Sequence, residues 1–371
     1  ESLYKPEVLQ PAGLEVLHTL GVIEKLQAQD VSRCEVFDFV SIQGRSLCRV
    51  DYRALAHPFP YALIAFPHVT QCILLEKLAD YPTIKVRWGS TLCGVRRSPG
   101  RPHQVTFFED SQLKCTSASV VVGADGKYSR VREAAGIRTK QTDYRDAFIT
   151  LVVQRPKPFG DAVRYFLGRR QILGMFPVSR DRLCLLYMVP AWGFDALKAR
   201  GLSALKAEMS AVSEEVAGML AEVTGWEQVS YMACRTVRAS SWVQDGMVLI
   251  GDAAHACHPH VAQGSTQAML DAVALAPVLA QHLNGGLLSA DKLKVYEEAR
   301  RPRVEALQRI AHEYAWLWNT GNPLLMWLRD RAFHEIGRRP RLLLKVAETE
   351  AGVRVAPLTV SERLQALGVL S

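Results

Sequence analysis

The sequence lacks several features that would assign it to a class at once. It contains no run of eighteen apolar residues, which argues against a membrane-spanning helix. Its eight cysteines show no CxxC spacing, so we expect buried thiols in a reducing, cytoplasmic compartment rather than a zinc site or a disulfide framework. No GxSxG segment is present, which argues against a serine hydrolase with a nucleophile elbow.

Excess charge of one sign is also scarce. The chain has 45 basic and 37 acidic residues, which leaves a net charge of +8. Because the basic residues are spread thinly, they favour small anionic partners, and we predict no nucleic-acid partner. The apolar fraction of 49% is that of an ordinary globular protein, which excludes a disordered chain.

The length of 371 residues is comfortable for two or three lobes. Apolar residues recur every three positions over 11–26, which predicts a helix. Segments 36–50 and 86–95 are β-like, 204–223 is helical, and the chain from 290 onward is mostly helical. This alternation predicts a parallel α/β domain that is interrupted by a β-rich insertion.

The segment VVVGADGKYSRVR (120–132) predicts a buried strand followed by a turn. In open α/β sheets, ligands bind where the parallel strands end. A glycine such as Gly126 lets the backbone approach a diphosphate closely, and the carboxylate of Asp125 can accept hydrogen bonds from a ligand. The alternative is a plain strand, turn and helix in which Asp125 forms an Asx turn and Ser129 caps the helix. Local physics leaves the two interpretations about equal.

The segment MVLIGDAAHACHPHVAQGSTQAMLDA (247–272) contains a second buried strand, which ends in Gly-Asp. The small alanines after Asp252 leave room for a bulky group. Beyond Pro259, Gly264 opens a helix whose free N–H groups attract negative charge. A single strand that ends in glycine and aspartate can be an ordinary turn. Two of them in one chain favour a ligand-binding site.

These two segments resemble the DG and GD motifs of group A FAD-dependent monooxygenases of the para-hydroxybenzoate hydroxylase type. The similarity in order and spacing extends over nearly the whole chain. It includes VLQPAGLEVLHTLGV (8–22), which is similar to the segment that follows the first βαβ unit of that family. A weaker likeness to the squalene epoxidase branch rests on Leu9–Pro11, Phe66–His68 and the pair His258-Pro259.

The resemblance implies an α/β fold, with a discontinuous Rossmann-like FAD-binding domain, an inserted antiparallel β-sheet substrate domain and a helical C-terminal region. The implied boundaries are 1–32, 67–147 and 239–320 for the FAD-binding domain, 33–66 and 148–238 for the substrate domain, and 321–371 for the C-terminal region. The C-terminal helices are expected to pack on the FAD-binding domain. Substrate choice is expected to depend on side chains of the inserted sheet, such as Tyr165, Phe176 and Tyr187.

The resemblance also implies the chemistry. NAD(P)H reduces FAD, dioxygen adds to the flavin, and the resulting hydroperoxide delivers one oxygen atom to a small aromatic or polyene substrate. The Pro259 loop is expected to shelter the flavin hydroperoxide from water, and no catalytic acid or base is assigned. The residues implied in FAD binding are Gln71, Asp125, Gly126, Gly251, Asp252, Pro259, Gly264 and Ser265. We expect a monomer or a homodimer.

The chain departs from the family pattern at several positions. The GxGxxG segment that binds the FAD diphosphate is absent, so we expect about thirty to forty further residues before Glu1. Where that unit is missing, we expect exposed apolar edges on the parallel sheet. Ala262-Gln263-Gly264 stands where the family usually has Gly-Gln-Gly, which reduces the freedom of that turn. Gln71 stands where many members have an FAD-contacting arginine.

Other interpretations remain open. An alkene epoxidase of the squalene epoxidase type, or a degenerate paralogue that binds flavin without catalysis, would share these motifs. A metal cluster of Asp252, His255, His258 and His260 is disfavoured, because these positions span a strand end and a loop broken by proline; we therefore expect no metal. The aromatic residues of 314–328 allow peripheral contact with a membrane surface, although ordinary helix packing is favoured.

Overall fold

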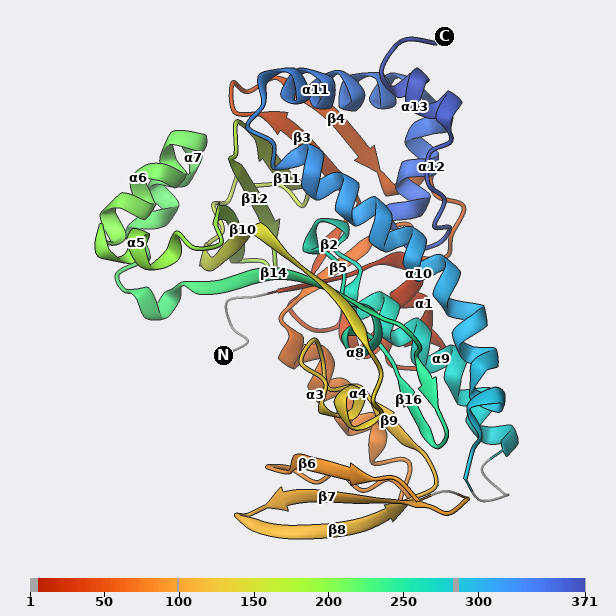
Figure 1. Ribbon diagram of the computed structural model, residues 1–371. Coiled ribbons are helices and arrows are strands. Elements are labelled where there is room, and N and C mark those ends of the chain that lie inside the picture. Colours follow the sequence, from red (N-terminus) through yellow and green to blue (C-terminus); the bar gives the residue numbers. More distant parts are fainter. Residues whose placement is uncertain (1–5, 99, 283–286, 371) are drawn as a thin grey trace.

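A seven-stranded sheet dominates the computed structural model, which describes residues 6–98, 100–282 and 287–370 (Figure 1). Its strand order is β14-β10-β13-β12-β11-β3-β4. The strands are β3 (Val36–Ser41), β4 (Ser46–Asp51), β10 (Thr139–Gln154), β11 (Val163–Leu167), β12 (Ile172–Pro177), β13 (Arg182–Pro190) and β14 (Ser230–Ala239). All neighbours are antiparallel except β11 and β3. The predicted antiparallel insertion is therefore confirmed, with one parallel pair added.

Both faces of this sheet are covered, which explains why its strands contain continuous apolar runs. Successive residues of a strand point to opposite faces. In β10, Phe148 belongs to the core on the side of the C-terminal helices, whereas Ile149 belongs to the core on the other side. The helices that cover this second side are α5 (Phe194–Ala199), α6 (Leu202–Val212) and α7 (Glu215–Met219). The break at Ser213 divides the single helix that we predicted over 204–223.

The predicted parallel sheet is short. β9 (Val121–Gly123) pairs in parallel with β16 (Met247–Leu249), and β15 (Val243–Gln244) adds an antiparallel edge. Leu249 lies opposite Gly123, so both strands end at the same edge of the sheet. Three helices accompany this sheet: α4 (Arg130–Ala134), α9 (Gly264–His282) and α10 (Ala290–Trp318).

Two expectations about strands in this half of the chain are wrong. Residues 86–90 form no strand, because the strand there begins only at Thr91. β9 is an edge rather than a buried strand: no described strand pairs with its other side, and the side chain of Val122 is 38% exposed.

The remaining N-terminal elements surround this centre. A small antiparallel sheet has the order β1-β5-β2. Its strands and the helices beside it are β1 (Glu7–Leu9), β2 (Ser32–Cys34), β5 (Ala62–Ala65), α1 (Pro11–Thr19), α2 (Ile23–Gln27) and α3 (Pro67–Leu78). A separate three-stranded sheet consists of β6 (Thr91–Arg96), β7 (His103–Glu109) and β8 (Gln112–Ala118). α1 packs on α9, which brings the N-terminal segment to the second strand-end motif.

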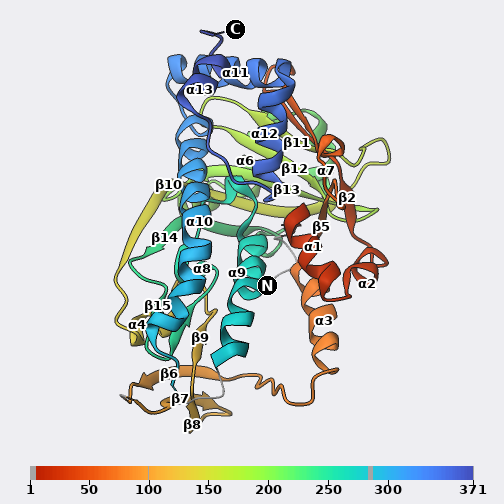
Figure 2. The ribbon, with the colours of Figure 1, turned by 90° about the vertical axis from the view of Figure 1, so that its right-hand side faces the viewer.

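The C-terminal helices are α11 (Pro323–Arg338), α12 (Pro340–Glu350) and α13 (Val360–Ala366). The expectation that they pack on the FAD-binding domain is incomplete: α11 contacts α10 and α12 accepts a hydrogen bond from Gln263, both within the ranges expected for that domain, but α11 and α12 also contact β4 of the seven-stranded sheet. α10 connects the two parts and runs from the region of β15 to α11 (Figure 2). No helix in the described ranges has the length and apolarity needed to cross a membrane.

Candidate active site

The turn after β16 forms the first part of the site. Gly251 has a φ of 57°, in the left-handed region that favours glycine. A Cβ at this position would lie 3.0 Å from the Cβ of Ala268. α8 (Asp252–His255) begins directly after it. The carboxylate of Asp252 is half-buried and has no hydrogen-bond or ion-pair partner among the described residues. It is therefore available to a ligand.

A buried ion network around Asp271 fixes this turn. One of its carboxylate oxygens accepts a hydrogen bond from the N–H of Gly251 at 2.8 Å and lies 2.5 Å from Nε2 of His255. The other oxygen accepts from Nε of Arg300 at 2.8 Å. Burial raises the pKa of Asp271, but the hydrogen bonds and charges of His255 and Arg300 outweigh burial and lower it overall. Neither Asp271 nor Arg300 was expected in the site. The one sequence signal for Asp271 is that it is a charged residue within the largely apolar helix α9.

The first motif forms a local helix cap. Oδ1 of Asp125 accepts a hydrogen bond from the hydroxyl of Ser129 at 2.5 Å. Oδ2 accepts from the backbone N–H groups of Arg130 and Val131 at 2.7 and 3.1 Å. The structure therefore contains the capped turn that the alternative interpretation describes. A direct contact of Asp125 with FAD stays a prediction.

Arg132 joins the two turns. Its guanidinium donates hydrogen bonds to the backbone oxygen of Ala253 at 2.7 Å and to that of Lys127 at 2.8 Å. Gly126 has a φ of 78° and open space where a Cβ would lie, so a ligand can approach its backbone. Arg132 thus ties the turn after β9 to the turn after β16.

The Pro259 loop enters α9 through a strained residue. After the short turn η4 (Pro259–Val261), Ala262 has a φ of 46°. A left-handed backbone costs about 1–2 kcal/mol for a residue with a Cβ, which explains why this turn favours glycine. Gly264 then begins α9, whose first N–H groups have no partner within the helix. The hydroxyl of Ser265 donates a hydrogen bond to Glu7 at 3.0 Å.

Two buried, neutral histidines hold the Pro259 loop in place. Burial lowers the pKa of His260 to about 4, although a contact of 2.7 Å between its Nε2 and Oδ1 of Asn319 acts in the opposite direction. Burial also lowers the pKa of His258, whose Nε2 has no partner among the described residues. The ring of His258 lies 4.5 Å from that of Tyr144 on β10. The loop is thereby docked on the seven-stranded sheet.

Gln71 stands apart from this arrangement. It is exposed on α3, and its side chain makes no hydrogen bond within the described part of the chain. Its contact with FAD stays a prediction.

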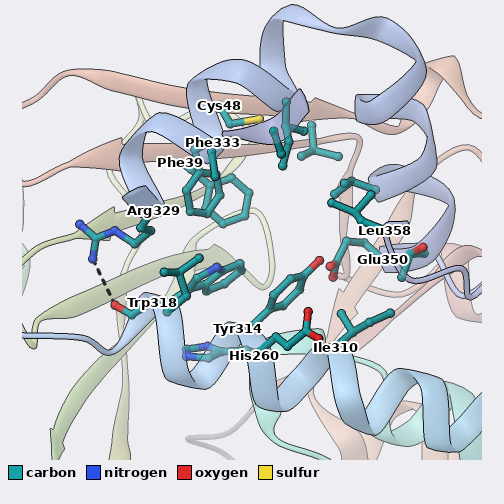
Figure 3. A pocket seen from close by; sticks show the side chains of 18 of the residues that line it. Phe39, Cys48, His260, Ile310, Tyr314, Trp318, Arg329, Phe333, Glu350 and Leu358 are labelled. Atoms are coloured by element: carbon teal, nitrogen blue, oxygen red, sulfur yellow. Dashed lines mark hydrogen bonds between the residues drawn. The ribbon is translucent and has the colours of Figure 1, made fainter. Parts of the chain in front are cut away.

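An aromatic cavity of about 380 Å³ lies beside the Pro259 loop, between the seven-stranded sheet and α10, α11 and α12 (Figure 3). The ring of Phe39 stacks on that of Tyr165 at a centroid distance of 5.2 Å. It also lies 5.3 Å from Trp318 and 4.8 Å from Phe333. The volume and the apolar wall suit a small organic molecule.

Only one of the three sheet residues predicted to select the substrate lines this cavity. Tyr165 does so, and Phe176 packs edge-on against its ring at 5.4 Å. Tyr187 lies in the core on the other face of the sheet, because alternate positions of β13 point away from the cavity.

Polar groups are few in the cavity wall, and two of them meet. Glu350, the last residue of α12, points toward the hydroxyl of Tyr314 on α10 (Figure 3). Burial raises the pKa of Glu350 to about 8, and a hydrogen bond from Tyr314 partly offsets this rise. The sequence analysis gave Glu350 no role, because a glutamate on a C-terminal helix is usually solvated.

Gln10 links the cavity to the start of α9. Its Oε1 accepts a hydrogen bond from the hydroxyl of Tyr52 at 3.1 Å, and its Nε2 donates to the backbone oxygen of Ala262 at 3.4 Å. Its backbone N–H donates to the hydroxyl of Thr266 at 3.4 Å. Gln10 and Ala262 both line the cavity, so its wall includes the turn that leads into α9.

Comparison with known proteins identifies the family. Residues 2–311 match the model of the FAD binding domain family. The chain belongs to this family. It is 29% identical to 6-methylpretetramide 4-monooxygenase of Streptomyces rimosus over 356 residues, which cover 95% of this chain and 85% of that protein. It is 35% identical to ubiquinone hydroxylase UbiL of Rhodospirillum rubrum over 385 residues, which cover 97% of this chain and 77% of that protein.

Solved structures confirm the fold. PqsL of Pseudomonas aeruginosa in complex with 2-aminobenzoylacetate superposes with a TM-score of 0.75 and 23% identity, over 90% of this chain and 88% of that one. The protein is a flavoprotein monooxygenase with FAD as its cofactor, as the DG and GD motifs predicted. NAD(P)H is the typical reductant of the family.

The strand-end residues of this monooxygenase fit FAD. The carboxylate of Asp252 is half-buried and unpartnered among the described residues, so it can accept hydrogen bonds from ligand hydroxyls. Ala253 and Ala254, which follow it, are small and fully buried, so they pack the turn against the core. The free N–H groups at Gly264 favour a negatively charged group. These are the features that a flavin with a polyhydroxyl chain requires.

Proposed function

We propose that this monooxygenase hydroxylates an apolar aromatic molecule bound in the cavity, with NAD(P)H and dioxygen as co-substrates. The observation that carries the proposal is that the Pro259 loop borders the cavity through His260 and Ala262 and leads directly into α9, at the turns that fit FAD. The names of several relatives point the same way, since they include 6-hydroxynicotinate 3-monooxygenase and pentachlorophenol 4-monooxygenase.

In this proposal, the chain itself binds, orients and excludes water. Asp252 and the N–H groups of Gly264 and Ser265 hold FAD, and Gly126 lets its diphosphate approach. FAD supplies the electrons and oxygen chemistry that the side chains lack. The aromatic wall of Phe39, Tyr165 and Trp318 positions a flat ring and keeps water out. Neutral His260 adds no charge beside this wall.

We also propose that the protein is cytoplasmic. All eight cysteines are thiols, four of them buried, which suits the reducing cytoplasm. The monomer or homodimer stays a prediction.

The proposal is tested by filling the cavity. Ala332 of α11 lines it, so Ala332→Trp should abolish substrate-stimulated NAD(P)H oxidation while flavin absorbance is retained. Ala199→Trp, on the exposed surface of α5, is the matched control and should oxidise NAD(P)H at the wild-type rate. A panel of phenols, naphthols and polyenes serves as substrates. Turnover of polyenes alone would favour the epoxidase, and unchanged hydroxylation by Ala332→Trp would exclude this cavity.

A further inference from the structure

We infer that Glu350 recognises a hydroxyl group on the substrate ring and accepts its proton during hydroxylation. This inference rests on the proposed function, because it assigns a role within the same cavity. Its basis is the position of Glu350 in the cavity wall, beside the hydroxyl of Tyr314 and without an ion-pair partner among the described residues, whereas the other carboxylate of the wall, Glu313, is paired with Arg363.

Glu350 is half-buried and lines the cavity, and Figure 3 shows its side chain beside that of Tyr314. No basic side chain of the described residues pairs with Glu350. Two ion pairs lie near the rim, Lys345 with Glu362 at 2.6 Å and Arg363 with Glu313 at 2.8 Å, and each neutralises itself.

The other titratable groups that face Glu350 are neutral at pH 7. Tyr314 of α10, Tyr52 of the short turn η1 (Tyr52–Ala54) and Tyr165 of β11 surround it, and burial raises the pKa of each phenol. His260 is neutral because burial lowers its pKa to about 4. Glu350 is thus the group whose charge changes near neutral pH in this part of the cavity.

The raised pKa makes proton transfer feasible. An ordinary phenol has a pKa of about 10. Transfer to an unperturbed glutamate of pKa about 4.5 is unfavourable by roughly five powers of ten, whereas transfer to a carboxylate of pKa about 8 is unfavourable by roughly two. The O–H bond of the substrate breaks, a new O–H bond forms on Glu350, and the electron pair stays on the substrate oxygen. The ring becomes more electron-rich, and the proton remains on Glu350 until the oxygenated product takes it back.

Binding of a hydroxyl-bearing ring should therefore release a proton from Glu350. The charged carboxylate accepts a stronger hydrogen bond than the neutral acid, so the ligand favours the ionised form. With a pKa of about 8, the ionised fraction rises about eightfold between pH 7 and pH 8.5, and the affinity for the ligand should rise by the same factor.

The test uses FAD-loaded protein and two probes, 1-naphthol and its methyl ether, 1-methoxynaphthalene. Calorimetric titration at pH 7 in buffers of different ionisation enthalpy counts the protons released. We expect close to one proton for 1-naphthol with the wild type, and none for the ether or for Glu350→Gln with either probe. Glu298→Gln, which changes an exposed glutamate of α10 outside the cavity, should behave like the wild type.

A second variant keeps the carboxyl group of Glu350 and changes only the hydrogen bond that it receives. Tyr314→Phe removes the hydrogen bond that lowers the pKa of Glu350, so the rise in 1-naphthol affinity should move to higher pH. Binding of both probes without proton release, or equal release by Glu350→Gln, overturns the role of Glu350 and leaves the proposed function standing. Binding of neither probe overturns the proposed function itself.

Discussion

Asp252→Ala should weaken FAD binding without weakening the fold. The carboxylate has no hydrogen-bond or ion-pair partner among the described residues, so its removal breaks no internal contact. We therefore expect the free energy of unfolding of the apoprotein to change by less than about 0.5 kcal/mol. A hydrogen bond to a charged group contributes about 1.5–3 kcal/mol, so the dissociation constant of FAD should rise roughly 10- to 150-fold.

Flavin fluorescence quenching measures the dissociation constant, and urea denaturation measures the stability. Asp195→Ala is the matched control, because Asp195 is an exposed aspartate on α5, far from the strand-end turns (Figure 1). It should leave both quantities unchanged. Two results would refute the reasoning: full FAD affinity in Asp252→Ala, or a loss of several kcal/mol in its stability, which would mean that Asp252 is structural.

Two further predictions concern stability. Asp271→Ala leaves Arg300 buried without its carboxylate, so the free energy of unfolding should fall by about 3–5 kcal/mol. Glu76→Ala breaks an exposed ion pair with Lys25 and should lower the free energy of unfolding by less than about 1 kcal/mol. Equal losses for the two variants in urea denaturation would contradict this prediction. His260 has a pKa of about 4 when folded against about 6.5 when unfolded, so the unfolded chain binds the proton first as the pH falls. The contribution of His260 should be complete above about pH 6.5 and decline by about 3 kcal/mol toward pH 4. His260→Gln should remove this part of the decline and leave the part that comes from buried His258.

Local motifs made part of the site predictable. A valine-rich strand that ends in glycine and aspartate specifies its own turn, so the positions of Gly126, Gly251 and Asp252 followed from the sequence. The unfavourable Ala262 was also visible, because glycine is the residue that its backbone prefers. Asp125 shows the limit of this reasoning, since the same local pattern allows a helix cap and a ligand contact, and the structure contains the cap.

The cavity was not predictable in the same way. Gln10, Tyr52, Tyr314 and Glu350 come from four separate parts of the chain and meet only when α10 and α12 pack beside the seven-stranded sheet. Periodicity indicates that a helix has an apolar face, but not which element it covers. For this reason the contact of the C-terminal helices with the seven-stranded sheet was not expected, and Glu350 received no role.

The central claim is that this protein transfers one oxygen atom from dioxygen to an aromatic substrate held in the cavity. The most direct measurement is mass spectrometry of the product formed by FAD-loaded protein from NAD(P)H, a naphthol and ¹⁸O-labelled dioxygen. We predict one labelled oxygen atom in each hydroxylated product. Unlabelled product, or NAD(P)H consumption that yields only peroxide with every aromatic tested, would contradict it.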